Sequence, residues 1–327
     1  YAVVTNLGLK AGLEEPWIRL LPITAALFSI VFFAAWSRRH FGRTIAWLVA
    51  TFCVLSNFHI HYSQDLRAYP YLLFASGLTM VLTDRLRDRP DWRSTAALAA
   101  AVAAGFYTNF TYALVLVPVA GMMMAPPSWN RGEAPDTRRM ARKRFSIAVL
   151  LGAVAFTPWL WMVSAYLPDR ISRTRQTEWT LQALGQRWEG LTVARGHFDL
   201  LSWVGLLLAV FFLVGIVIAA RMRIGRWVLL PAVATLIVWE VVLVLVRHWS
   251  APRYDTTLWP FLVVLMALGF ERFLRLLRWR WLQWTACAAM VIAMLFRVDA
   301  HLHSARPHWN LLADAVREVR RPGETVV

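Results

Sequence analysis

Long apolar stretches separated by short polar loops make up most of this sequence. A helix needs about 20 predominantly apolar residues to cross the hydrocarbon core of a bilayer, and such windows recur along the chain. The pattern predicts ten membrane-spanning helices, at about 17–36, 44–60, 67–83, 94–107, 110–126, 145–165, 199–220, 227–246, 255–271 and 279–297. The fourth and fifth are short and are joined by YTNFTY (107–112), so they form either a tight helical hairpin or one broken pair. The fold class expected is an all-α polytopic membrane protein.

The composition supports a membrane protein and changes how the charge is interpreted. Of 327 residues, 58% are hydrophobic and only 17% are charged, whereas about 25% are charged in an average soluble domain. A net charge of +16 would ordinarily suggest nucleic-acid binding. Here the arginines fall in short loops between apolar segments, so membrane topology explains them and no nucleic-acid partner is expected. The two cysteines, Cys53 and Cys287, both lie in apolar segments and form no disulfide framework.

The basic residues predict the orientation of the chain. Twenty arginines and lysines fall in the compact loops after the first, third, fifth, seventh and ninth segments. Basic residues in short loops mark the cytoplasmic side. The loops around residues 59–71, 166–198 and 247–255 are therefore predicted to face the outside, together with the C-terminal tail. Polar chemistry is expected to gather on that outer face.

Three domains are predicted. Residues 1–297 form the membrane domain. Within its outer loop 166–198, the near-helical spacing of apolar residues in Thr177–Leu191 predicts an interfacial helix, and a plain solvated loop is the alternative. Residues 298–327 carry an amphipathic helix from about Trp309 to Arg320 and are expected to begin an extracytoplasmic domain. The chain starts in mid-pattern at Tyr1, so a fragment at both ends is expected.

The stretch HIHYSQDLRAYPY (59–71) places several polar residues between two apolar segments. Asp65 is suited to bind a divalent cation or to act as a base, and Arg67 can grip phosphate oxygens with its planar fork. The alternative is a polar loop cap in which Arg67 snorkels to lipid headgroups. His59 and His61 are weak metal candidates because no third ligand is evident, so a structural role is favoured for them.

A second group of polar residues opens the ninth segment in APRYDTTLWPFL (251–262). Arg253 and Tyr254 suit a lipid-linked phosphate at headgroup level, and a pair of interfacial anchors is the alternative. Glu240 lies inside the eighth segment, where a carboxylate is costly and is a functional candidate by default; it is otherwise neutralised by an arginine or protonated. The sequence has no phosphate-binding glycine loop, dinucleotide fingerprint or HExxH motif.

These motifs, in this order along essentially the whole chain, resemble the membrane glycosyltransferases of the C-type superfold. The resemblance is to the branch that contains protein mannosyltransferases and lipid A aminoarabinose transferases. The strongest match is YSQDLRAY (62–69), and the next is Arg253, Tyr254 and Pro260. One departure is Asn109, where the family often has a histidine after Tyr-Thr.

The resemblance implies a mechanism and a set of site residues. In this family a sugar on a polyprenyl phosphate is transferred, with inversion, to an acceptor hydroxyl on the outer face, and arginines stabilise the leaving phosphate. Carried over by motif, Arg67, Arg253 and Tyr254 would bind the donor phosphate. The residues expected to line the site are Tyr62, Gln64, Asp65 and Glu240. A divalent metal helps some members, with Asp65 and His61 as weak candidates here.

The resemblance also implies a catalytic acidic pair in an outer loop that follows one further span, both expected upstream of Tyr1. No catalytic residue is therefore assigned. The function expected is hexosyl or pentosyl transfer at the outer face of a bacterial plasma (inner) membrane, to a glycan, lipid or protein. Two alternatives stay open: a transporter or flippase of lipid-linked sugars, and a non-catalytic scaffold in envelope assembly.

Overall fold

A computed structural model describes residues 17–63, 67–125, 135–164, 202–245 and 256–303, and every regular element in these ranges is helical. The expected all-α class is confirmed. The main helices are α2 (Leu20–Phe41), α3 (Arg43–Val54), α4 (Asn57–Ser63), α5 (Tyr69–Asp88), α6 (Trp92–Thr108), α7 (Ala113–Met124), α8 (Pro135–Ser164), α11 (Ser202–Arg221), α12 (Leu230–Leu245), α13 (Trp259–Leu276) and α14 (Arg280–His303). The proposed interfacial helix at 177–191 and the helix at 309–320 lie outside the described residues.

The number of spans is not confirmed, although each of the ten predicted segments contains a helix. Four helical segments are long and apolar enough to cross a membrane, or five if α3 and α4, bent by 59°, are one span. The four are Leu20–Phe41, Pro135–Met162, Trp203–Arg221 and Gly225–Val242. The other helices fall short for physical reasons: α6 and α7 have only 17 and 12 residues, and α5 and α13 end in charged turns.

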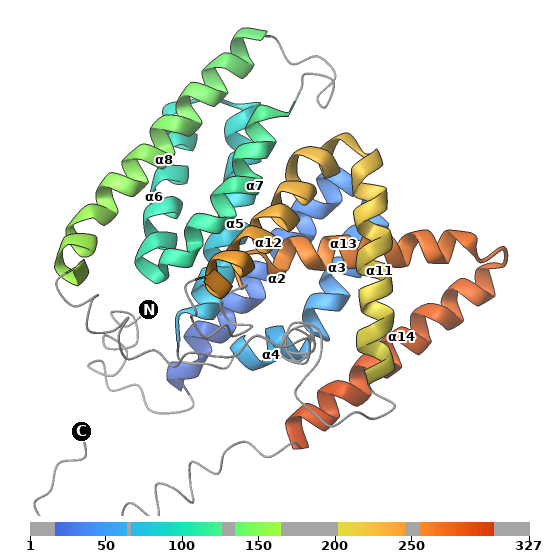
Figure 1. Ribbon diagram of the computed structural model, residues 1–327. Coiled ribbons are helices and arrows are strands. Elements are labelled where there is room, and N and C mark those ends of the chain that lie inside the picture. Colours follow the sequence, from blue (N-terminus) through green and yellow to red (C-terminus); the bar gives the residue numbers. More distant parts are fainter. Residues whose placement is uncertain (1–16, 64–66, 126–134, 165–201, 246–255, 304–327) are drawn as a thin grey trace, which may run out of the picture.

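Helix α5 is central to one half of the molecule. It packs against α2, α6, α7 and α8, and Figure 1 shows α6 and α8 on the flank opposite α11 and α14. Its apolar side chains are buried on more than one face, as with Leu72, Leu73 and Leu86. This burial explains why α5 has no single apolar stripe, because a helix enclosed by neighbours is apolar on several sides.

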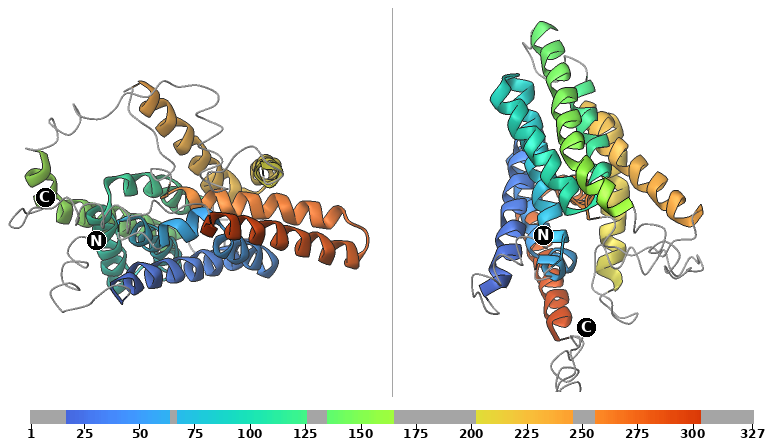
Figure 2. Two further views of the ribbon diagram at one scale, coloured as in Figure 1. Left: turned by 90° about the horizontal axis from the view of Figure 1, so that it is seen from below. Right: turned by 90° about the vertical axis from the view of Figure 1, so that its left-hand side faces the viewer.

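Helix α13 is the buried helix of the other half. Every residue from Leu258 to Phe270 is buried, and α13 packs against α3 and α11. At the crossing with α11, Gly269 faces the carbonyl oxygen of Phe211, and Gly215 faces that of Leu265. The two backbones approach too closely for a Cβ atom at either glycine. After α13 the chain turns at 277–279 and α14 runs back beside it (Figure 2).

The C-terminal carbonyls of α7 are covered by three arginines from neighbouring helices. Arg87 of α5 donates to the carbonyl oxygen of Met122 at 2.6 Å. From α8, Arg142 donates to Met123 at 3.0 Å, and Arg138 donates to Ala125 at 2.5 Å. Cations here also complement the negative end of the helix dipole. We call this side of the molecule, where α2, α5 and α7 end, the basic end.

The turn between α5 and α6 is fixed by an acidic N-cap. The Asp91 side chain accepts a hydrogen bond from the backbone N–H of Ser94 at 2.6 Å, and this bond holds the pKa of Asp91 below its usual range. A carboxyl whose pKa is lower in the folded state stabilises the fold above its unfolded pKa of about 3.9.

We therefore expect Asp91→Ala to lower the melting temperature at neutral pH, because a helix loses its cap. The difference in melting temperature between Asp91→Ala and the unsubstituted protein should become smaller as the pH falls through the folded-state pKa of Asp91. Thermal melts in detergent across this pH range would measure it. A difference that does not change with pH would contradict the role given to the carboxylate.

Candidate functional site

A bend between α3 and α4 positions the histidines of the first polar motif. Helix α3 stops at Val54, and α4 restarts after Ser56, whose hydroxyl accepts a hydrogen bond from the backbone N–H of His59. The bend turns His59 inward, where its Nε2 lies 3.2 Å from the hydroxyl of Ser29 on α2. His59 is thus a buried packing residue. No cluster of metal-binding side chains is found within the described ranges, so neither His59 nor His61 gains support as a ligand there.

Aromatic rings join α4 to α5 and α13. Phe58 contacts Tyr62 and Trp259, with ring centroids 4.7 Å and 5.4 Å apart. Tyr62 contacts Tyr69, the first residue of α5, at 4.8 Å, and His59 also meets Trp259 at 5.5 Å. We call Phe58, His59, Tyr62, Tyr69 and Trp259 the aromatic cluster. Contacts at these centroid distances are typical of paired aromatic rings, and they fix how the three helices meet.

The aromatic cluster brings the two sequence motifs together. Tyr62 and Tyr69 are the two ends of YSQDLRAY, and Trp259 belongs to APRYDTTLWPFL. Two segments almost 200 residues apart therefore meet where both were predicted to carry the site. Sequence reasoning did not assign Phe58, Tyr69 or Trp259 to the site, although all three lie in or next to the quoted motifs.

The structure describes some of the predicted site residues but not others. Gln64, Asp65, Arg253 and Tyr254 lie outside the described residues. Tyr62 is half-buried in the aromatic cluster, whereas His61 and Arg67 are exposed, and Arg67 directly precedes Ala68 and α5. Glu240 is half-buried in α12. Tyr62 contacts Tyr69 within the first motif and is linked to Trp259 of the second motif by way of Phe58.

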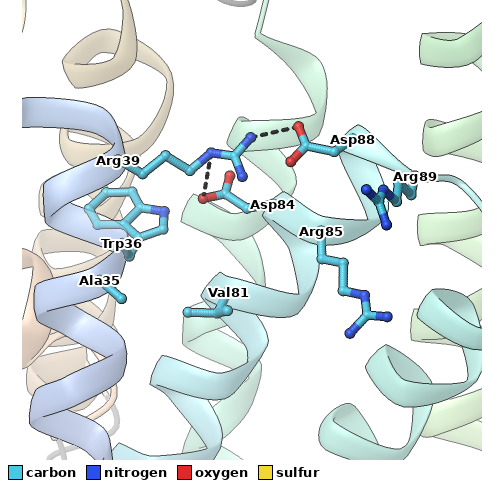
Figure 3. Close-up of a pocket in the computed structure, with 8 residues that line it drawn as sticks. All are labelled: Ala35, Trp36, Arg39, Val81, Asp84, Arg85, Asp88 and Arg89. Carbon is cyan, nitrogen blue, oxygen red and sulfur yellow. Dashed lines mark hydrogen bonds and ion pairs between the residues drawn. The ribbon is translucent and has the colours of Figure 1, made fainter.

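A concave site lies at the basic end, between α2 and α5. Its cavity has a volume of about 460 Å³ and is lined by Ala35, Trp36, Arg39, Val81, Asp84, Arg85, Asp88 and Arg89. Figure 3 shows Arg39 reaching from α2 to two carboxylates on α5. Arg39 donates to Asp88 at 2.6 Å and lies 3.6 Å from Asp84. Asp84 is also 2.7 Å from the Nε2 of His40. We call this the inner pocket.

The inner pocket was missed because the sequence analysis used its arginines only to orient the chain. The signal was present as Asp84 and Asp88, two carboxylates four residues apart within a basic loop region. The pocket and the aromatic cluster lie at opposite ends of α5. Sixteen residues separate Tyr69 from Arg85, which is about 24 Å along a helix. The molecule therefore has two separate polar regions.

Comparison with known proteins gives one informative match. No sequence family and no curated protein matches the chain. The crystal structure of ArnT from Cupriavidus metallidurans in the apo state matches with a TM-score of 0.55 and 19% sequence identity, over 98% of this chain and 54% of that one. The chain has the fold of ArnT. It spans about half the length of that protein.

The ArnT fold confirms part of what the sequence predicted. The resemblance to membrane glycosyltransferases of the lipid A aminoarabinose transferase branch holds at the level of the fold. Together with the apolar helices, it makes the chain an integral membrane protein. At 19% sequence identity, this match concerns the architecture of the chain.

Proposed function

We propose that the protein transfers a sugar from a polyprenyl-phosphate-linked donor to an acceptor hydroxyl at the extracytoplasmic face of the membrane. The observation that carries the proposal is the contact, within an ArnT fold, between the two motifs that resemble this family. Phe58 and Tyr62 connect the YSQDLRAY segment to Trp259, five residues after Tyr254. This contact supports a common site for the phosphate-binding arginines.

The proposed reaction is a single displacement. The acceptor oxygen attacks the anomeric carbon, the bond from that carbon to the phosphate oxygen breaks, and the configuration inverts. The acceptor proton passes to a carboxylate, and the electron pair of the broken bond leaves with the polyprenyl phosphate. Arg67 and Arg253 would stabilise the charge that develops on the leaving phosphate, since a guanidinium binds phosphate oxygens as a fork.

The remaining predicted roles follow from the same proposal. Tyr254 would assist Arg253 at the phosphate, and the residues that line the site would be Tyr62, Gln64, Asp65 and Glu240. The active site would face the periplasm or exterior of a bacterial plasma membrane, as the distribution of arginines indicates. The partners would be the lipid-linked donor, membrane lipid and an acceptor glycan, lipid or protein.

The test is a transfer assay on the full-length protein in proteoliposomes. A panel of polyprenyl-phosphate sugars would be supplied with a lipid or glycan acceptor, and release of polyprenyl phosphate would be followed by mass spectrometry. We expect release that requires both protein and acceptor, with an inverted anomeric centre in the product. Movement of labelled donor across the bilayer with no release would instead favour the flippase alternative. A protein that shows neither release nor movement of the donor, but still binds envelope proteins, would favour the scaffold alternative.

A further inference from the structure

The inner pocket has a charge pattern that leaves two arginines available for a ligand. Arg39 is held by Asp84 and Asp88, and Asp84 is also bonded to His40. Across the described residues, no hydrogen bond or ion pair engages the guanidinium group of Arg85 or of Arg89, and both side chains are exposed. The pocket lining has three arginines and two aspartates. Its net charge of +1 suits a ligand with one negative charge.

The indole of Trp36 is a second and independent sign of a ligand. Trp36 is only 1% exposed, and its Nε1 has no hydrogen-bond partner in the part of the chain that the structure describes. Figure 3 shows this nitrogen on the ring edge turned toward Asp84 and α5. An indole N–H can only donate, and a buried donor left unsatisfied is unfavourable. An acceptor oxygen in the pocket would satisfy it.

Along the axes of α2 and α5, the lining of the pocket passes from apolar to charged residues. An amphiphilic ligand would need this arrangement. Both α2 and α5 run toward the basic end. The apolar residues Ala35 and Val81 lie one helical turn before Arg39 and Arg85, because residues four apart stack on one helix face. Arg89 lies a further turn along. The lining thus changes from apolar to charged over about two turns, or roughly 11 Å.

This change from apolar to charged lining lies at the end of α2, a helix that can span a membrane. Helix α2 has 22 residues and is long enough to cross a bilayer, so its final turn lies at the level of the lipid headgroups. Both helices present their carbonyl ends here, which repel anions. An anion must therefore be held by side chains, and Arg85, Arg89 and the indole N–H of Trp36 supply suitable donors.

We propose that the inner pocket binds the phosphodiester headgroup of an anionic membrane phospholipid, with the acyl chains leaving along Ala35 and Val81. This site is separate from the proposed transfer site at the other end of α5 and does not depend on the proposed reaction. The lipid's phosphate oxygens accept hydrogen bonds from Arg85 and Arg89, and Trp36 donates one from its buried N–H.

The test uses native mass spectrometry of the full-length protein in detergent, titrated with phosphatidylglycerol, phosphatidylcholine or inorganic phosphate. We expect one phosphatidylglycerol to bind in preference to phosphatidylcholine. The variant Arg85→Ala/Arg89→Ala should weaken phosphatidylglycerol binding about tenfold or more, since hydrogen bonds to charged groups are the stronger class. Trp36→Phe, which keeps the ring but removes the N–H, should weaken it by a smaller factor.

The matched control is Arg272→Ala/Arg278→Ala, which removes two exposed arginines that do not line the pocket. It should leave the preference for phosphatidylglycerol unchanged. Equal weakening in this control would mean that general surface charge attracts the lipid, and would overturn the site. Undiminished binding in Arg85→Ala/Arg89→Ala would do the same. If millimolar inorganic phosphate competes with phosphatidylglycerol, the site binds a free anion and the proposed lipid is wrong. A melting temperature unchanged in lipid-free detergent shows that each variant folds.

Discussion

Replacing Arg67 by alanine is expected to lower the rate of sugar transfer about 100-fold, the order of magnitude lost when one donor to a developing negative charge is removed. Arg67 is exposed immediately before α5, so the substitution removes no core packing and the protein should remain folded. Arg67→Lys should recover part of the rate, because lysine keeps the charge but cannot form two parallel bonds to phosphate. Single-turnover assays with a labelled donor would measure both.

The matched control for Arg67 is Arg43→Ala. Arg43 is also exposed but opens α3, at the basic end. Its removal should leave transfer unchanged. Undiminished transfer by Arg67→Ala would remove Arg67 from the donor site, whereas equal losses in Arg67→Ala and Arg43→Ala would point to a general electrostatic effect. Arg253→Ala should resemble Arg67→Ala if both arginines hold the same phosphate.

The second large effect is expected at the crossing of α11 and α13. Gly269→Ala should destabilise the protein by about 3 kcal/mol, the upper part of the range for overpacking. The added Cβ would meet the carbonyl oxygen of Phe211, and a backbone atom held by its own helix cannot move aside as a flexible side chain can. Thermal unfolding in detergent would measure the loss.

The test discriminates well because helix propensity and overpacking change the stability in opposite directions. Within a helix, alanine is favoured over glycine by up to about 1 kcal/mol, so without the close crossing Gly269→Ala would stabilise the protein. Leu276→Ala, at a position 68% exposed on the same helix, is the control and should change the melting temperature little. A melting temperature for Gly269→Ala at or above that of the unsubstituted protein would contradict the crossing.

The helices could be predicted from the sequence because each depends on a local pattern. Apolar windows located α2, α11 and α12, whereas the arginines in the last turns of α2 and α5 were used only to orient the chain. Charged residues inside the last turns of α5 and α13 lower the mean hydropathy of these helices, and this is one reason why the predicted count of ten spans is not confirmed.

The parts of the site that were not predicted depend on contacts between distant residues. Nothing near His59 in the sequence indicates that its ring meets both Ser29 and Trp259. Likewise, Arg39 and Asp88 are 49 residues apart, so their pairing follows only from the packing of α2 on α5. The motifs indicated which residues carry chemistry, and the packing of helices decided which of them meet.

The arginines over the end of α7 impose an order on the biogenesis of the protein. Arg87 is made before α7, whereas Arg138 and Arg142 are made after it. While the ribosome is still synthesising the loop that follows α7, only one of these three guanidinium groups is available to the exposed carbonyls. We therefore expect the end of α7 to gain its full set of arginine donors only after α8 has been synthesised.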